Sequence, residues 1–456
     1  MASWVSDELS TLSLGDVRRE DRLKQVIERM ADNPTGSIPQ VFSDTSDVIA
    51  AYRLLSNAAF EPEAVYDALC ESTVSRVREE SALILVAHDT TSLDYTKHSA
   101  TEGLGPIGGG NDGTAGQGIF VHSSMAVTSD GLPLGLLNVR TWTRDPEQVG
   151  LRHSRHERPI TEKESHRWLE GLAAASRCLP QDREVLHIAD READIFELFA
   201  APRPQQAHLL IRATRERCLS DGAGNLWDVM AAMPQAGTYT ITVRQYPDHK
   251  PREARLAVRY RAVTLKPPAK ALRHNPDLEE ITMTAIWVTE LDPPKAREPI
   301  DWQLLTDLTV ADLAAARELV SHYTRRWLIE RFHYTLKSGC GTEDSQLRTA
   351  ERLQRLLALY CVVAWRLLWM TYVARGRGDH PCTTAFADVE WQVMYRYHHG
   401  KQPLPDQPPP LRDVVLWMAQ LGGFLARKGD GDPGVKVLWR GLIRLQDIVT
   451  GYLLTH

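Results

Sequence analysis

The sequence lacks several features that would assign a protein to a class directly. Its six cysteines include no pair in C-x-x-C spacing, which argues against a zinc ribbon or a C-x-x-C redox motif. This cysteine usage fits a reduced cytosolic compartment best. The first 16 residues contain no apolar run of the kind that a signal peptide needs. The longest apolar stretch, Leu356–Met370, contains Arg366 and is too short to span a bilayer. We therefore expect a cytoplasmic protein without a membrane role.

The chain also lacks net positive charge. The formal net charge of its 456 residues is −6, which excludes an evenly basic nucleic-acid coat protein. The charge is unevenly distributed, however. Residues 1–80 carry 8 basic and 15 acidic side chains, residues 203–276 carry 13 and 5, and residues 321–378 carry 10 and 4. The two basic segments are either solvated surfaces or the binding site of an anionic partner. At this length the chain suffices for about two to four domains with full cores.

The hydrophobic pattern changes period along the chain. Apolar residues recur at helical spacing within residues 1–80, 161–177, 311–373 and 411–456. Short apolar runs typical of buried strands occur at 83–87, 119–127, 132–139, 185–189 and 209–211. From 238 to 290 the pattern alternates with period two, which predicts an antiparallel β insertion. The chain is therefore expected to have an α/β fold flanked by helical regions at both ends.

Two of the predicted strands end on an aspartate. Asp89 follows the run at 83–87 by way of His88, and Asp190 follows the run at 185–189 directly. Ligands of open α/β sheets gather beyond the strand ends, and carboxylates there are natural Mg²⁺ ligands. The alternative is that each aspartate only caps the segment that follows its strand.

The run from Tyr323 to Lys337 is expected to form one helix. At about 100° per residue, Tyr323, Arg326, Glu330 and Lys337 fall on one face, and a separate apolar stripe faces the core. The first face could hold a metal through Glu330 and phosphate oxygens through the two cations. The alternative is an ordinary salt-bridged surface, with Arg326 paired to Glu330 at i,i+4.

This spacing, Tyr-x2-Arg-x3-Glu-x6-Lys, resembles the signature of transposases of the Tn-five type. Other matching motifs follow in the same order over nearly the whole chain, and in combination they are specific: Leu14-Gly15-Asp16-Val17-Arg18-Arg19, Asp89-Thr90-Thr91-Ser92-Leu93, Glu162-Lys163-Glu164-Ser165, Asp190-Arg191-Glu192-Ala193-Asp194-Ile195 and Leu421-Gly422-Gly423-Phe424.

The resemblance implies an RNase H-like catalytic core with an antiparallel β insertion between the second and third acids. It implies a helical DNA-end-binding domain at 1–65, a catalytic domain at 66–373 with the insertion at about 213–300, and a helical dimerisation domain at 374–456. From periodicity alone, the C-terminal helices could equally pack on their own core. The implied acidic triad is Asp89, Asp190 and Glu330. These residues would hold two Mg²⁺ ions, for which Mn²⁺ would substitute, and catalyse in-line phosphoryl transfer.

The resemblance also implies DNA contacts. Tyr323, Arg326 and Lys337 would contact phosphates, and Trp302 would stack a base flipped out during hairpin formation. For Trp302 the alternative is core packing. Further implied contacts are Arg212, after the third core strand, and Arg22 and Arg53 in the N-terminal domain. Two lysines that the family uses for DNA are replaced here by Thr214 and Tyr334.

The implied activity is cut-and-paste transposition. The protein would bind double-stranded terminal repeats, nick them, cut both ends through a hairpin and join the 3′ ends to target DNA. It would act as a homodimer on paired ends, in the bacterial cytoplasm and associated with the nucleoid. The alternatives are an inactive DNA-binding relative and an RNase H-like nuclease that cuts without strand transfer.

Overall fold

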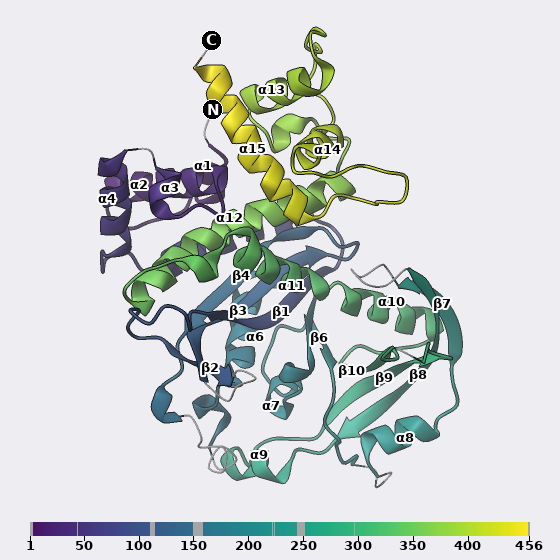
Figure 1. Cartoon of the computed structure of the whole chain (residues 1–456). Coiled ribbons are helices and arrows are strands. Elements are labelled where there is room, and N and C mark those ends of the chain that lie inside the picture. Colours follow the sequence, from purple (N-terminus) through teal and green to yellow (C-terminus); the bar gives the residue numbers. More distant parts are fainter. Residues whose placement is uncertain are drawn as a thin grey trace. The chain divides into compact units, whose positions relative to one another are not determined.

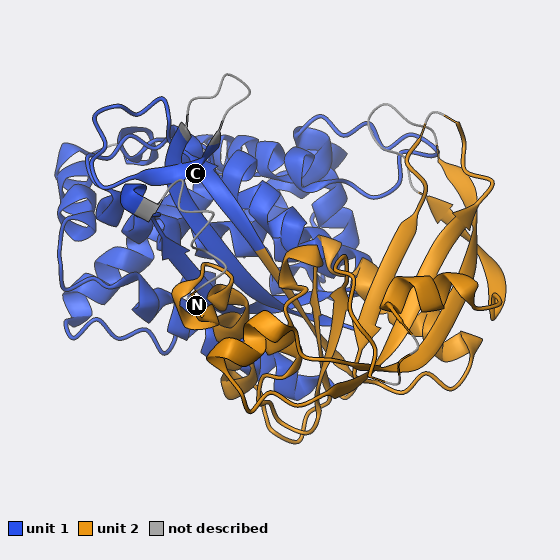
Figure 2. Cartoon of the chain, turned by 90° about the horizontal axis from the view of Figure 1, so that it is seen from below, with its two compact units in different colours: residues 1–80, 90–149, 328–456 blue, residues 81–89, 150–327 orange. Residues whose placement is uncertain are grey.

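A computed structural model describes residues 3–42, 44–109, 115–148, 158–220, 222, 224–243, 251–295 and 297–454. The chain divides into two compact units, shown in different colours in Figure 2. Unit 1 comprises Met1–Glu80, Thr90–Val149 and Leu328–His456, and unit 2 comprises Ser81–Asp89 and Gly150–Trp327. Unit 1 therefore combines segments from both sides of the expected boundaries at 65 and 373, whereas unit 2 lies wholly between them. The three-domain division stays a prediction.

The N-terminal part of unit 1 is helical, as the periodicity predicts (Figure 1). Its helices are α1 (Trp4–Glu8), α2 (Val17–Asp32), α3 (Ile38–Val41), α4 (Thr45–Leu55) and α5 (Pro62–Glu79). Asp16 and Asp44 cap α2 and α4, each accepting a hydrogen bond from a backbone N–H in the first turn. The predicted apolar stripe of α2, Leu23, Val26 and Ile27, is buried.

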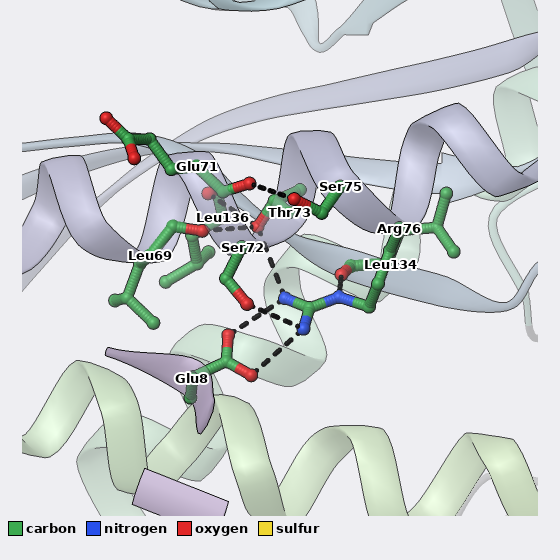
Figure 3. Close-up of polar contacts among 9 residues, drawn as sticks. All are labelled: Glu8, Leu69, Glu71, Ser72, Thr73, Ser75, Arg76, Leu134 and Leu136. Carbon is green, nitrogen blue, oxygen red and sulfur yellow. Dashed lines mark hydrogen bonds and ion pairs between the residues drawn. The ribbon is translucent and has the colours of Figure 1, made fainter. Parts of the chain in front are cut away.

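Arg76 of α5 joins three elements of unit 1 (Figure 3). Its guanidinium forms an ion pair with Glu8 of α1 at 2.8 Å, and its Nε donates to the carbonyl of Leu134 on β4 (Pro133–Trp142). The side chain also lies over the ring of Trp365. The bidentate pair with Glu8 holds α1 against α5, and the bond to Leu134 holds β4 against α5.

The strands of unit 1 form an antiparallel set. β3 (Ala115–Thr128) pairs with β2 (Gly105–Gly109) and with β4, and the last five residues of β1 (Ile84–Asp94) belong to this unit. The β3–β4 connection is the expected turn, where Gly131 adopts a φ of 102° that favours glycine. The short 3₁₀ helices of unit 1 are η1 (Pro146–Gln148), η6 (Thr342–Asp344) and η7 (Cys382–Thr384).

The C-terminal part of unit 1 is helical. It contains α11 (Trp327–Tyr334), which begins at the last residue of unit 2, the π-helical turn η5 (Thr335–Gly339), α12 (Ala350–Gly376), α13 (Asp388–His399), α14 (Leu411–Leu421) and α15 (Val435–Leu453). Among the described residues, α12 alone is long and apolar enough to cross a membrane, but 83% of its most apolar window is buried inside the protein. It is therefore the core helix of this region.

Helices α14 and α15 approach each other at two glycines. A Cβ added at Gly441 of α15 would lie 1.8 Å from the carbonyl oxygen of Met418, and one added at Gly422 would lie 1.8 Å from that of Val437. No side chain fits at either position. The glycine at position 422 of the family motif is therefore explained by packing, because it allows the backbones of α14 and α15 to come into contact.

Unit 2 is built on a mixed sheet. The first five residues of β1 pair in parallel with β5 (Val185–Ala189), and β5 pairs in parallel with β6 (Ala207–Arg212). Antiparallel strands follow in the order β10 (Asp301–Thr306), β9 (Ile281–Leu291), β8 (Arg252–Leu265) and β7 (Gly237–Val243). The strands β7, β8 and β9 lie between β6 and β10 in the sequence, so the antiparallel insertion is confirmed.

Helices cover both faces of this insertion in unit 2. Alternate residues of a strand point to opposite faces, so Trp302 of β10 contacts α10 (Leu313–Thr324) while Leu305 joins the core under α8 (Leu226–Ala232). Figure 1 shows α10 and α8 on the two sides of the sheet. The other helices of unit 2 are α6 (His166–Cys178), α7 (Phe196–Phe199), α9 (Ala269–His274), η3 (Ile160–Glu162) and η4 (Arg191–Ala193).

Candidate functional site

Asp89 and Asp190 follow the paired parts of two neighbouring parallel strands in unit 2. The prediction that the first strand ends at Asp89 is wrong, because β1 continues to Asp94, whereas β5 does end at Ala189, directly before Asp190. In the register of β1 and β5, His88 lies opposite Ala189, so the two aspartates follow at the same edge of the sheet. Both are half-buried. The expected capping role is present as well, because Asp190 Oδ1 accepts a hydrogen bond of 2.9 Å from the backbone N–H of Glu192.

The electrostatics of Asp190 are those of a crowded anionic site. Burial raises the pKa of Asp190, and the carboxylate of Asp89 raises it further. The hydrogen bond from Glu192 and the positive charge of Arg326 oppose this rise. An ionised carboxylate is therefore penalised here, and a cation bound between the two acids would remove the penalty.

Four of the predicted DNA contacts form a group around Tyr323, which interacts with Asp190. Tyr323 is 5% exposed, and its ring meets that of Trp302 edge to face, with the centroids 5.8 Å apart. The guanidinium carbon of Arg326 lies 5.9 Å from the centroid of the Tyr323 ring. Burial raises the pKa of Tyr323, the charges of Arg326 and Arg212 lower it, and Asp190 raises it. Unit 2 thus brings together two acids, two arginines and two aromatic rings.

Arg212 is the last residue of β6 and lies opposite Leu304 of β10. Its Nη2 donates to the carbonyl of Asp301 at 3.2 Å, next to Trp302. Trp302 is half-buried against Tyr323, so the structure shows both packing and partial exposure for this ring.

The prediction of one continuous helix from Tyr323 to Lys337 is wrong. Helix α10 ends at Thr324, and Arg325 and Arg326 form a turn in which each backbone N–H bonds three residues back. Helix α11 then begins at Trp327, and Lys337 lies in the π-helical turn η5. A constant advance of about 100° per residue does not hold across these irregularities, so the common face inferred from it is not established.

Unit 1 holds Glu330 and Lys337. Glu330 is half-buried on α11, whereas Ile329, Phe332 and Leu336 are fully buried, which confirms the predicted apolar stripe. Lys337 lies near Asp94 in the same unit. Hydrogen bonds from Thr96 are the main cause that lowers the pKa of Asp94, and the charge of Lys337 contributes to this shift.

The metal site that the sequence implies draws on both units, because Glu330 belongs to unit 1 and the two aspartates belong to unit 2. Within the described residues, no three His, Cys, Asp or Glu side chains form a group that could hold a metal ion. The triad therefore stays a prediction. The donor set of unit 2 nevertheless suits a divalent cation, since Asp89 and Asp190 supply hard oxygen ligands at one sheet edge.

The two predicted N-terminal DNA contacts differ in their surroundings. Arg22 Nη1 forms an ion pair of 2.6 Å with Asp47 in the first turn of α4. Arg53 is exposed on α4. Their DNA-binding roles stay predictions, and Arg22 would have to exchange its carboxylate partner for a phosphate, or contact one with its remaining N–H groups.

Sequence reasoning missed a buried histidine pair beside the aspartates. His88 Nε2 and His187 Nδ1 are 2.9 Å apart, and His187 Nε2 lies 3.3 Å from Ser176 Oγ on α6. Burial lowers the pKa of His88 to about 3 and that of His187 well below its usual value, so both rings are neutral. Neutral rings linked in this way hold β1 and β5 together, one residue before Asp89 and three residues before Asp190. The only signal in the sequence was a histidine within each apolar strand.

Three family models match successive parts of the chain. A transposase DNA-binding model matches residues 1–60, which contain α1 to α4. A transposase DDE domain model matches residues 157–366, which contain Asp190 and Glu330 but begin after Asp89. A model of the transposase Tn5 dimerisation domain matches residues 362–454, which contain α13 to α15. The order of the three matches is the order of regions that the sequence motifs imply.

Proposed function

Because the chain belongs to the Tn-five-type DDE transposases, we propose that it catalyses complete cut-and-paste transposition. It binds the terminal repeats of a transposon, cuts both ends through a hairpin intermediate and joins the 3′ ends to target DNA. Double-stranded DNA and a second copy of the chain are its partners. A transposase of this kind works in the bacterial cytoplasm, at the nucleoid.

The observation that carries this proposal is the cluster around Asp190 in unit 2. Asp89 and Asp190 supply carboxylates directly after the last pair of the adjacent strands β1 and β5, and Arg326 and Arg212 supply positive charge to this cluster. Anionic ligands for the metal next to cationic ligands for phosphate are what DNA cleavage requires. The transposase DDE domain model, which matches residues 157–366, covers Asp190, Arg212 and Arg326 and supports a catalytic role for this cluster over a purely structural one.

Each acid of the proposed site then has a defined task. Asp89 and Asp190, with Glu330 as the proposed third acid, hold two divalent metals. Mg²⁺ is the proposed ion, with Mn²⁺ as a substitute. When bound, the metals lower the pKa of the attacking water or 3′-hydroxyl and stabilise the leaving oxygen. Lys337, on η5, is a further proposed phosphate ligand.

Two side chains fix the DNA end in this proposal. Arg326 orients the phosphate beside the acids, and the buried Tyr323 supports Arg326 through the contact of ring and guanidinium. Trp302 offers its half-exposed ring to a base extruded during hairpin formation, and stacking on it offsets about 1–3 kcal/mol of the unstacking cost. Removing Trp302 would therefore affect hairpin formation more than the first nick.

The test uses the inverted repeats that flank the coding region. A labelled duplex with these repeats, a supercoiled target plasmid and Mg²⁺ are incubated with the full-length protein. The proposal predicts nicked ends, then hairpins, then 3′ ends joined to the plasmid. Cleavage without joined product would indicate a nuclease, and binding without cleavage would indicate an inactive relative.

A further inference from the structure

The loop after β6, Ala213–Arg217, is tied to the segment that follows Asp190. Asp194 is 0% exposed, and its Oδ2 accepts backbone hydrogen bonds from Thr214 at 2.8 Å and from Arg215 at 2.7 Å. Its Oδ1 forms an ion pair with Arg217, which is 6% exposed. These three partners compensate the free-energy cost of burying the Asp194 carboxylate, and they hold the loop in one position.

Neighbouring elements hold the same loop from other sides. The indole N–H of Trp227 on α8 donates to the carbonyl of Arg215 at 3.2 Å, and the carboxylate of Glu216 accepts from the backbone N–H of Trp227 at 3.0 Å. The backbone N–H of Ala213 donates to the carbonyl of Gln303 on β10 at 2.7 Å. The backbone of Arg215 is therefore fixed through both its N–H and its carbonyl group.

This loop lies at the sheet edge that carries the acids. In the parallel register of β5 and β6, Ala189 is opposite Ile211, so Asp190 and Arg212 follow at the same edge. The loop continues directly from Arg212. Its next cation, Arg215, has an exposed side chain on a fixed backbone. A pre-positioned cation loses less conformational freedom on binding than one on a mobile loop.

We propose that Arg215 is an additional contact to the DNA backbone and that Asp194, through its pairing with Arg217, is the residue that positions it. The proposal rests on the proposed DNA-cleaving function of this site. The ligand is a phosphate of the bound duplex, recognised by its charge. Sequence-independent contacts of this kind contribute affinity and salt dependence rather than specificity.

The experiment measures binding of the terminal-repeat duplex by fluorescence anisotropy between 50 and 200 mM salt, using the full-length protein. Arg215→Ala should weaken binding roughly fivefold to tenfold at 100 mM salt. It should also reduce the slope of log K against log[salt] by about 0.9, which is the contribution of one phosphate contact. Arg215→Lys should restore most of the slope. The matched control is Arg177→Ala, at an exposed arginine on α6, and it should leave both quantities unchanged.

Asp194→Asn tests the positioning role, because the amide cannot pair with Arg217 and the loop should loosen. It should reduce the slope as Arg215→Ala does, and the double variant should be no weaker than Asp194→Asn alone. If Asp194→Asn does not fold, Trp227→Phe replaces it, since this change keeps an aromatic ring but removes the indole N–H that bonds to the carbonyl of Arg215. A wild-type slope for Arg215→Ala would overturn the inference. A wild-type protein that does not bind the repeats would instead overturn the proposed function.

Discussion

Asp89 and Asp190 each follow the last parallel pair of β1 and β5, which is formed by His88 and Ala189. Burial and the charge of Asp89 both raise the pKa of Asp190. The fold therefore holds two carboxylates at a cost in free energy that a bound cation would remove. This arrangement places the candidate metal site at the sheet edge where ligands bind in open α/β folds.

Divalent metal should stabilise the protein through these acids. Ligand that binds only the folded state adds about 2.7 kcal/mol at a concentration of 100 times its Kd. Mg²⁺ or Mn²⁺ should therefore raise the thermal unfolding midpoint of the wild type, and Asp190→Asn should lose most of that increase. Asp182→Asn, at an exposed acid, is the control and should keep it. An equal increase in wild type and Asp190→Asn would place the metal elsewhere.

Tyr323 should support cleavage through its hydroxyl group. Tyr323→Phe keeps the ring against Trp302 but removes the polar group beside Arg326. We expect the cleavage rate to fall about tenfold, since a hydrogen bond to a charged group contributes about 1.5–3 kcal/mol. The thermal midpoint should change little. Tyr397→Phe, at an exposed tyrosine, should leave both rate and midpoint unchanged. A wild-type rate for Tyr323→Phe would show that the hydroxyl has no part in the reaction.

The buried histidines should make the fold sensitive to acid. The pKa of His88 is about 3 in the folded protein and about 6.5 in an unfolded chain. That of His187 is also well below its usual value. The unfolded state therefore binds more protons once the pH falls below about 6.5, and stability is lost progressively from there toward pH 3.

Urea unfolding at pH 7.5 and pH 5.5 measures this loss. Each histidine should account for about 1.4 kcal/mol of the fall in unfolding free energy between these pH values. His88→Gln cannot take up the proton and should show a fall smaller by about that amount, even if it is less stable at both pH values. His274→Asn, at an exposed histidine, serves as control. Equal falls in His88→Gln and wild type would contradict the account.

Gly441 should be needed for the contact of α14 with α15. A Cβ at this position would lie 1.8 Å from the carbonyl oxygen of Met418, so Gly441→Ala must push the helices apart. We expect a loss of about 1–3 kcal/mol in unfolding free energy, as for other overpacked sites. Gly451→Ala is the matched control on the same helix, because nothing lies within 4 Å of its added Cβ. If the two variants unfold at the same temperature, the close approach is not required.

Much of the fold is predictable from local pattern. The apolar runs before Asp89 and Asp190 are buried strands, and the alternation between 238 and 290 predicts the antiparallel strands β7 to β9. Asp16 and Asp44 cap the helices that follow them. These features depend on neighbours in sequence, which is why period and capping chemistry suffice to find them.

One local feature could not be predicted from the sequence. The turn at Arg325 and Arg326 carries no glycine or proline, and the segments on both sides are helical, so the helical periodicity continues across the turn.

Other features depend on residues far apart in sequence. His88 and His187 are separated by 99 positions and meet only because β1 pairs with β5. Asp194 and Arg217 meet in the same way at the end of β6. Each of these contacts requires the sheet order, which local pattern does not contain.

The most direct test of the central claim is DNA cleavage by single-acid variants. Asp89→Asn, Asp190→Asn and Glu330→Gln keep the shape of each side chain but remove the charge that a divalent metal requires. With the terminal-repeat duplex and Mg²⁺, each should lose at least about 10²-fold in cleavage rate, more than is typical for changes outside the ligand set. DNA binding measured by anisotropy should persist in all three. Cleavage at the wild-type rate by any one of them would contradict the assignment of these three acids as the catalytic centre.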